Sequence, residues 1–319
     1  MNSEHFVRLA LHILKCSQKE LAGRLGVSST QISKWKKGEH MSDEMENKFR
    51  EITQIGEYSP QLVEWSGSVE NAAKWDHLLH FLAERAQDNA ETGYITMPLQ
   101  DEEGFLCEET IDVLDRIGLP APKSFPKELN VDYEYTEDKE GECLWNAIDN
   151  NPYSSVIDKI YCSLNDVYGF YAAYVDELIQ DDGLDIYSTD AINIMNSLMS
   201  LAACKIEVDA AIAPNFNHFR YEVEKNYENW LNELKLLAFR AGIPLRAELL
   251  QMVYDTADKL SVAAEAESLD LNKSRIHPDI YMNELLTGMR IIHQVLPAIM
   301  EKLEITDFKL DETDLRARR

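Results

Sequence analysis

The chain has 319 residues, a length that fits about two domains. With 45% hydrophobic and 28% charged residues, its composition excludes an intrinsically disordered protein. No apolar run reaches the length of about 18 residues that a membrane helix needs, so we expect no membrane span. Five widely spaced cysteines without a C-x-x-C pair predict a reduced, cytoplasmic chain.

Charge divides the chain into two unequal regions. The formal net charge is −26, but residues 1–55 hold nine Lys and Arg and seven Asp and Glu, a balance of +2. The remainder therefore carries −28 and repels a polyanion such as DNA. The asymmetry predicts a domain boundary after about residue 55, and it assigns any contact with nucleic acid to the small N-terminal region.

Periodicity and capping residues predict four helices in the small region, over about 3–15, 17–25, 29–36 and 43–55. Ser17 and Glu20 form an S-x-x-E capping box at the start of the second helix. Gly26 ends that helix in the left-handed conformation. The side chains predicted to face a shared core are Phe6, Leu9, Ala10, Ile13, Leu14, Leu21, Ala22, Leu25, Ile32, Trp35, Met45, Phe49 and Ile52.

Between Ser17 and Gly38, polar, small, apolar and glycine positions follow the spacing of two short helices and a tight turn: Gln18, Leu21, Ala22, Gly26, Val27, Ser28, Ile32, Trp35 and Gly38. This pattern resembles the helix-turn-helix of the phage-repressor (Cro/XRE-type) family. The resemblance covers residues 3–55 only. It implies a four- to five-helix DNA-binding domain over residues 1–57, whose second motif helix enters the major groove. A helical packing module that has lost DNA binding is the alternative.

The resemblance also implies roles for individual residues. Ser29, Thr30 and Lys34 would contact bases. Lys can donate to guanine, and the short hydroxyls can hydrogen-bond either donors or acceptors on the base edges. Gln18 would bond a phosphate and brace the recognition helix. The predicted DNA-binding residues together are Gln18, Ser28, Ser29, Thr30, Gln31, Ser33, Lys34 and Lys37. Since serine and threonine discriminate weakly between bases, sequence specificity would depend mainly on Lys34 and on DNA shape.

The middle of the chain is less regular. Its Pro, Gly and Ser content predicts a linker over 58–68. A helix follows over 71–86, in which His77 and His80 have the i, i+3 spacing of a metal-binding pair. Without further ligands nearby in the sequence, we interpret them as surface or packing histidines. Residues 92–140 are predicted to be partly irregular, with extended pieces at each end around a helix at 105–117.

The acidic region from 69 to 319 is predicted to be mainly helical. Long helices are expected over 153–180, 190–213, 216–241, 245–266 and 278–303. Their lengths and short connections favour an antiparallel bundle, so the fold class as a whole is all-α. The aromatic run in the first of these helices is interpreted as core rather than as the lining of a ligand pocket.

The acidic region carries no recognisable catalytic motif. Neither a phosphate-binding G-x-x-x-x-G-K-[ST] loop nor G-x-G-x-x-G, H-E-x-x-H or G-x-S-x-G occurs. His218 and Glu222 have the i, i+4 spacing of an acid–base dyad, but a surface ion pair is the simpler interpretation. We therefore expect no enzyme activity, no cofactor and no metal.

Taken together, the sequence predicts a DNA-binding transcriptional regulator of a bacterium or phage, acting on double-stranded DNA as a homodimer. The acidic domain would dimerise, sense a small ligand or bind a protein partner. The alternative is a phage-defence or toxin–antitoxin protein whose helical domain binds a protein. A further hypothesis is that the acidic domain folds over the basic patch and competes with DNA.

Overall fold

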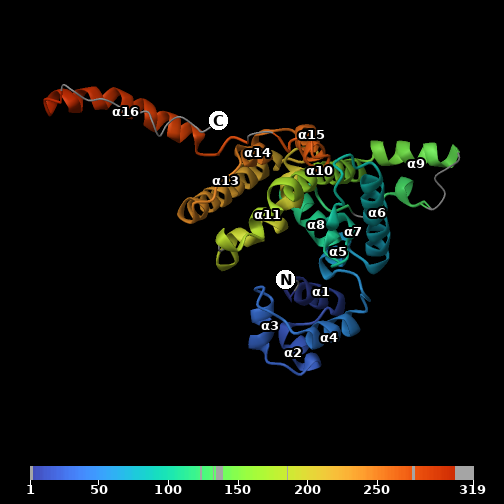
Figure 1. The fold of residues 1–319 in the computed structure, drawn as a ribbon. Coiled ribbons are helices and arrows are strands. Elements are labelled where there is room, and N and C mark those ends of the chain that lie inside the picture. Colours follow the sequence, from blue (N-terminus) through green and yellow to red (C-terminus); the bar gives the residue numbers. More distant parts are fainter. Residues whose placement is uncertain are drawn as a thin grey trace.

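The computed structural model describes residues 3–122, 124–131, 133, 139–184, 186–274 and 277–305. The described residues form helices and connecting turns without a β-strand, which confirms the all-α prediction. Helices α1 to α4 form a small lobe, α5 to α15 form a larger body, and α16 projects from the body (Figure 1). The helices span α1 Ser3–Leu14, α2 Gln18–Leu25, α3 Ser29–Trp35, α4 Asp43–Thr53, α5 Pro60–Ser66, α6 Val69–Asp88, α7 Met97–Gln100, α8 Leu106–Ile117, α9 Lys139–Asn150, α10 Pro152–Tyr174, α11 Asp176–Ile179, α12 Leu198–Ala203, α13 Phe216–Ala241, α14 Gln251–Tyr254, α15 Ala257–Ser268 and α16 Met282–Lys302.

The small lobe has an aromatic core. The Phe49 ring of α4 packs between Phe6 of α1, at a centroid distance of 5.8 Å, and Trp35 of α3, at 6.0 Å. The indole nitrogen of Trp35 donates to the carbonyl of His40, so its polar atom is satisfied in the core. These inward positions agree with the predicted core, but Ile13 is 39% exposed, because α1 turns it away from the lobe.

Most of the segment predicted as a linker, 58–68, is helix α5. Ser59 caps this helix, Pro60 is its first residue, and Gly67 ends it in the left-handed conformation at φ 80°. The residues whose composition suggested a linker are thus the start and stop signals of a short helix. Leu62, Val63 and Trp65 are buried, since α5 packs against α1, α6 and α8.

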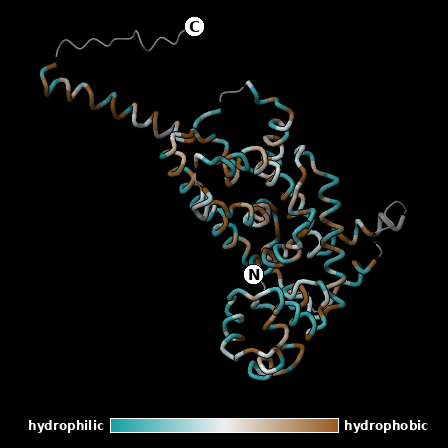
Figure 2. Tube along the Cα trace, turned by 60° about the horizontal axis from the view of Figure 1, so that its bottom comes forward, coloured by the Kyte–Doolittle hydropathy of each residue, from teal (hydrophilic) through white to brown (hydrophobic). Residues whose placement is uncertain are grey.

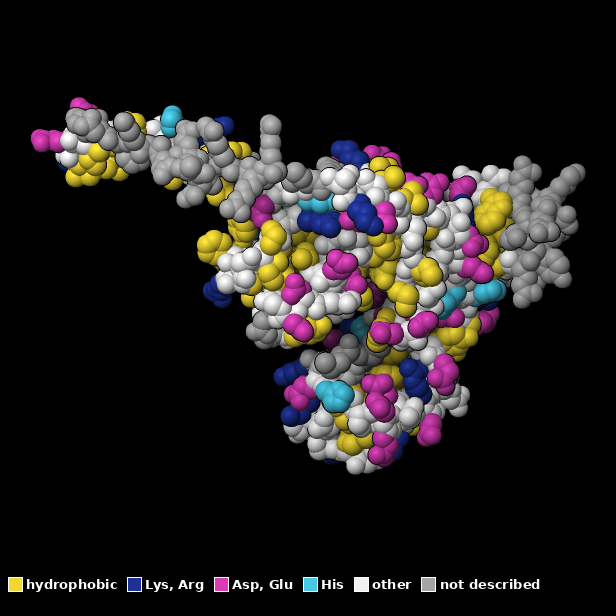
Figure 3. Space-filling model, viewed as in Figure 1, with side chains coloured by type: hydrophobic (Ala, Val, Ile, Leu, Met, Phe, Trp, Pro, Cys, Tyr) yellow, Lys and Arg dark blue, Asp and Glu magenta, His cyan; other side chains and the backbone are white. Residues whose placement is uncertain are grey.

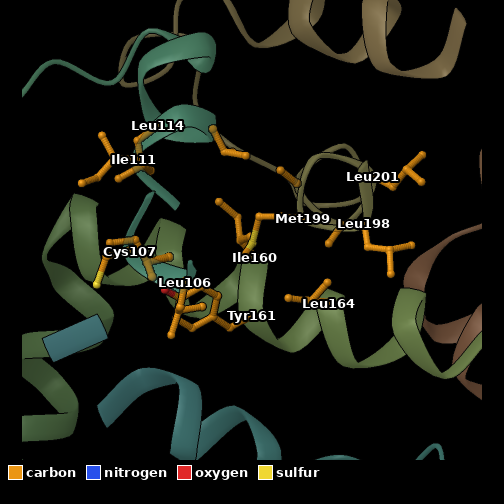
Figure 4. Close-up of a cluster of buried hydrophobic side chains, with 14 of the residues drawn as sticks. Leu106, Cys107, Ile111, Leu114, Ile160, Tyr161, Leu164, Leu198, Met199 and Leu201 are labelled. Atoms are coloured by element: carbon orange, nitrogen blue, oxygen red, sulfur yellow. The ribbon is translucent and has the colours of Figure 1, made fainter. Parts of the chain in front are cut away.

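Helix α10 is the centre of the body. It packs against α6, α12 and α15, and α8 completes the core on the α12 side. Figure 4 shows the apolar side chains of α8, α10 and α12 converging around Ile160 and Tyr161. The fully buried Tyr161 shares a 2.7 Å hydrogen bond with the hydroxyl of Thr110. The aromatic run of α10 is therefore core, as predicted: Tyr161, Tyr168, Phe170, Tyr171 and Tyr174 are all buried.

Helix α13 has the predicted bounds, whereas the helices predicted over 190–213 and 245–266 are broken, and the one predicted over 153–180 is interrupted at Val175 between α10 and α11. Residues 190–197 form a 3₁₀ helix, and only Leu198–Ala203 of that segment is α-helical. The second break separates α14 from α15 at Asp255 and Thr256, which are extended. The Lys205 ammonium donates to the carbonyls of Val253, at 2.9 Å, and Asp255, at 2.7 Å. These long-range hydrogen bonds satisfy carbonyls at the break, and local periodicity cannot reveal them.

The middle segment is also more helical than expected. The piece at 92–100, predicted to be extended, holds a turn and the four-residue helix α7. Most of the second predicted extended piece, 130–136, lies outside the described residues. No helix in the part of the chain that the structure describes combines the length and apolar character needed to cross a membrane.

Candidate nucleic-acid interface

Helices α2 and α3 are joined by the three residues 26–28. The capping box at the start of α2 is formed: the Ser17 hydroxyl accepts from the Glu20 amide, and the Glu20 carboxylate accepts from the Ser17 amide at 2.8 Å. Gly26 adopts φ 71°, a conformation that side chains disfavour, and the next amide, of Val27, donates to the carbonyl of Ala22. Both ends of α2 are therefore determined by residues close to them in the sequence.

Helix α3 is two-sided. Ile32 and Trp35 are buried in the lobe, while Ser29, Thr30 and Lys34 are exposed on the opposite side. The amide of Gln31 donates to the Ser28 hydroxyl at 3.1 Å, so the first turn of α3 is capped. The structure thus brings the three predicted base-contacting side chains onto one accessible surface, which we call the α3 edge and define as Ser29, Thr30 and Lys34.

The remaining predicted site residues flank the α3 edge. The Ser33 hydroxyl lies 3.0 Å from the Ser29 carbonyl oxygen and 3.4 Å from Oε1 of Gln18. This second distance links α3 to the start of α2, the bracing position expected of Gln18. Gln31 is half-buried, whereas Ser28 and Lys37 are exposed.

The surface around α2 and α3 is locally basic. From Gln18 to Gly38 the chain has five Lys or Arg and one acid, in contrast to the strongly acidic body. Figure 3 shows Lys and Arg side chains gathered on the edge of the small lobe over which α3 runs. Positive potential at this edge favours approach of a polyanion.

An acidic residue that sequence reasoning missed lies beside the α3 edge. Nζ of Lys34 is 3.2 Å from the Glu39 carboxylate, and both side chains are about half exposed. Their separation of five residues has no helical signature, because α3 ends at Trp35 and Gly38 turns the chain between them with φ 85°. The ion pair engages the ammonium that would reach a base, so Glu39 competes with any base contact of Lys34.

The acidic body does not cover the α3 edge. Helix α1 is the element of the small lobe that packs against α5, and α3 packs within the lobe (Figure 1). Ser28, Ser29, Thr30, Lys34 and Lys37 are all exposed in this arrangement. The structure therefore does not show the acidic domain folded over the basic patch, as the competition hypothesis requires.

A cluster in the body contains three groups of metal-ligating type. One atom each of Asp76, His80 and Cys107 lies within 4.8 Å of the others, and His77 is not part of the group. Nδ1 of His80 is 2.8 Å from the Asp76 carbonyl, and Nε2 is 3.0 Å from the Asp101 carboxylate. These contacts, led by the hydrogen bond to Asp101, raise the pKa of His80 to about 9. In the structure these side chains are linked to one another, because His80 pairs with Asp101 and the Cys107 thiol donates to the Asp76 carboxylate at 3.4 Å.

The body also contains a polar cavity of about 340 Å³ between α12 and α13. Its lining includes Arg116, whose guanidinium donates to the Ser200 hydroxyl at 3.0 Å, and the amides of Asn193, Asn196, Asn226 and Asn229. Such groups can hydrogen-bond a small polar molecule.

His218 and Glu222, whose spacing was interpreted as a surface ion pair rather than an acid–base dyad, form such a pair. His218 and Glu222 of α13 lie 3.4 Å apart, and both side chains are largely exposed. Neither residue lines the polar cavity between α12 and α13. The simpler interpretation of their spacing therefore fits the structure.

Comparisons with known proteins assign no family. No protein-family model matches the chain, and neither a curated protein nor a solved structure shows significant similarity to it. The geometry of the α3 edge and its surroundings is therefore the basis for a functional proposal.

Proposed function

We propose that the chain is a sequence-specific DNA-binding transcriptional regulator of a bacterium or phage. The α3 edge carries this proposal: an exposed polar surface on a helix whose other side is anchored in the lobe core by Ile32 and Trp35. A helix held in this way can enter the major groove, where Lys34 would read guanine and Ser29 and Thr30 would make short contacts. Gln18, Ser28, Gln31, Ser33 and Lys37 would contact or position the sugar–phosphate backbone.

The larger body supplies regulation in this proposal. Two copies of the chain would place two small lobes on half-sites about 34 Å apart, one turn of DNA. The polar cavity beside Arg116 suits a small ligand that biases the arrangement of the body. The protein would act in the cytoplasm.

The size of the body favours one further candidate. An acidic domain extending from 69 to 319 is larger than dimerisation requires, which fits a phage-defence or toxin–antitoxin protein that binds a protein partner. Affinity purification of the full chain from its host distinguishes the two proposals. A stoichiometric partner favours the second candidate, and recovery of the chain with DNA alone favours the regulator.

Selection of bound duplexes from a random pool, with the full chain as bait, tests the regulator. The expected result is an enriched motif with two symmetric half-sites. A double change of Ser29 and Thr30 to alanine, or Lys34→Ala, should then alter the enriched bases. A pool without enrichment, or a motif unchanged by all these substitutions in folded protein, contradicts the assignment of α3.

A further inference from the structure

Helix α16 projects from the body, away from the other described helices (Figure 1). Its contacts with the body are concentrated at Tyr281, directly before the first turn. The Tyr281 hydroxyl donates to the carbonyl of Lys235, and its ring meets Phe239 at a centroid distance of 6.1 Å. No other described helix packs along the length of α16.

Seven apolar side chains in and directly after α16 follow a heptad. Steps of three and four residues alternate without interruption from the first turn of the helix to its end, the spacing of a and d positions in a coiled coil. The a positions are Met282, Met289, Leu296 and Leu303, and the d positions are Leu285, Ile292 and Ile299. We call these seven side chains the α16 seam. Each of them is between 44% and 63% exposed, and Figure 2 shows the apolar residues recurring along the helix.

The α16 seam is unusual for a surface that stays in water. Among the described residues, eleven of the twenty-five large apolar side chains that are exposed lie between 282 and 305. Contiguous apolar surface of this kind marks an interaction site. Most helical stability in proteins comes from packing of an apolar face, and Pro297 inside α16 removes one backbone hydrogen bond. Packing of the seam against a partner supplies the missing stabilisation.

The geometry points to a second copy of this chain as that partner: we propose that α16 associates with α16 of further copies in a homo-oligomeric helical bundle. A heptad is self-complementary, because each a or d side chain fits between four side chains of an identical helix. The flanking e and g positions bring few charges together, since they hold Leu286, His293, Met300, Gly288, Val295 and Lys302. These six e and g positions therefore place only one Lys and one His beside the seam.

The side chains at a and d also bear on the size of the assembly. Leucine at a with isoleucine at d favours more than two strands, and Leu296 and Ile299 follow that pattern. Apolar Leu286 and Val295 widen the face beyond the seam. The association does not depend on DNA binding by α3, but it would supply the two small lobes that a two-fold operator needs.

Light scattering coupled to size-exclusion chromatography of the full chain tests this proposal at micromolar concentration. The wild type should have at least twice the chain mass of 36.6 kDa. Ile292→Glu, at a d position, should shift the mass to that of one chain. Gln294→Glu adds the same charge at an exposed f position and should leave the mass unchanged. None of the five tryptophans lies in α16, so their fluorescence checks that the body of each variant stays folded.

Two results overturn the proposal. One is a monomeric wild type, and the other is an Ile292→Glu variant that keeps the wild-type mass. A monomeric wild type that floats with vesicles of zwitterionic and anionic phospholipids would assign the seam to membrane binding instead of self-association. Because none of these readouts involves DNA, failure here is distinguishable from failure of the proposed regulator function.

Discussion

At the scale of single residues, one ion pair determines how available the Lys34 ammonium is at the α3 edge. Lys34 is the longest side chain of the edge, and Glu39 holds its ammonium at 3.2 Å. An exposed pair of this kind contributes little to stability, so breaking it costs little when a better partner arrives. Glu39 therefore acts as a weak competitor for any DNA base or phosphate that Lys34 contacts.

Removing this competitor should strengthen DNA binding. Glu39→Gln is expected to raise the affinity for a selected duplex by up to about fivefold, the range of an exposed ion pair. Lys34→Ala should weaken the same complex by roughly 5- to 150-fold, the cost of removing one good base contact, and change non-specific binding much less. Fluorescence anisotropy titrations at constant salt measure both effects.

Glu51→Gln is the matched control, because it removes the same charge from an exposed position on α4. Its affinity should stay close to that of the wild type if the effect of Glu39 is local. Equal gains from both substitutions would attribute the change to net charge and argue against a specific role of the Lys34–Glu39 pair.

His80 makes stability depend on pH. Its pKa is raised from 6.5 to about 9, chiefly by the hydrogen bond to Asp101. A raised folded-state pKa stabilises the fold fully below the unfolded value, and the stabilisation is lost as pH rises through about 9. The free energy of unfolding should therefore fall between about pH 7 and pH 9, by on the order of 1 kcal/mol because solvent screens the half-exposed ring. Urea denaturation at both pH values measures it.

The fall should be smaller in His80→Gln. His218→Gln is the control, since the ring of His218 is largely exposed and its pair with Glu222 lies on the surface. A wild-type fall that persists undiminished in His80→Gln would assign the pH dependence to other groups. Glu109, whose pKa burial raises to about 7, titrates mostly below this window.

At the scale of elements, the packing of the body depends on the close approach of the segment after α6 to helix α10. Gly169 lies in α10 where Thr92 crosses it, and a β-carbon there would come within 2.6 Å of the Thr92 β-carbon. Thr92 is fully buried and belongs to the turn before α7, so it has no free space into which to move. The glycine thus lets the irregular segment after α6 pack directly on the central helix.

Gly169→Ala should destabilise the protein by about 1–3 kcal/mol, the usual cost of overpacking a core. Gly23→Ala is the matched control, because Gly23 is also helical but has no atom within 4 Å of the added β-carbon. That change should stabilise by up to about 1 kcal/mol through helix propensity. Chemical denaturation of both variants measures the difference, and equal effects would show that the contact with Thr92 is unimportant.

At the scale of the whole molecule, charge divides the chain into two regions. The small lobe has a slight positive balance, whereas the remainder carries −28. In the proposed function, contact with DNA would therefore come from a few cations at one end of the molecule, and the acidic body would keep the rest of the surface away from the duplex.

The salt dependence of binding should reflect these few cations. Lys37→Ala is expected to lower the slope of log affinity against log salt by about one, the share of a single phosphate-binding lysine, and to weaken all duplexes alike. Lys225→Ala, an exposed lysine on α13, should leave the slope unchanged. Titrations from about 50 to 200 mM salt measure the slope, within the range where such effects are large. An unchanged slope for Lys37→Ala would place this residue outside the interface.

Local sequence signals were sufficient for the small lobe and for α13. The capping box of Ser17 and Glu20, the left-handed Gly26 and the buried Ile32 and Trp35 each have a cause within a few residues of chain, so they were predictable. The bounds of α13 are likewise marked by its own apolar spacing and by Gly242. Helix α5 shows the limit, since Ser59, Pro60 and Gly67 serve equally well in a linker or as helix caps.

By itself, the sequence determined the helical class, the charge division and the composition of the α3 edge, because these depend on residue type and short spacing. Tertiary structure alone decided which distant groups meet. It brought Lys205 to the break between α14 and α15, Asp101 to His80, and Glu39 back to Lys34. It also left the α16 seam exposed. Whether an apolar stripe is buried depends on the elements that surround it, and the sequence of the stripe alone does not decide this.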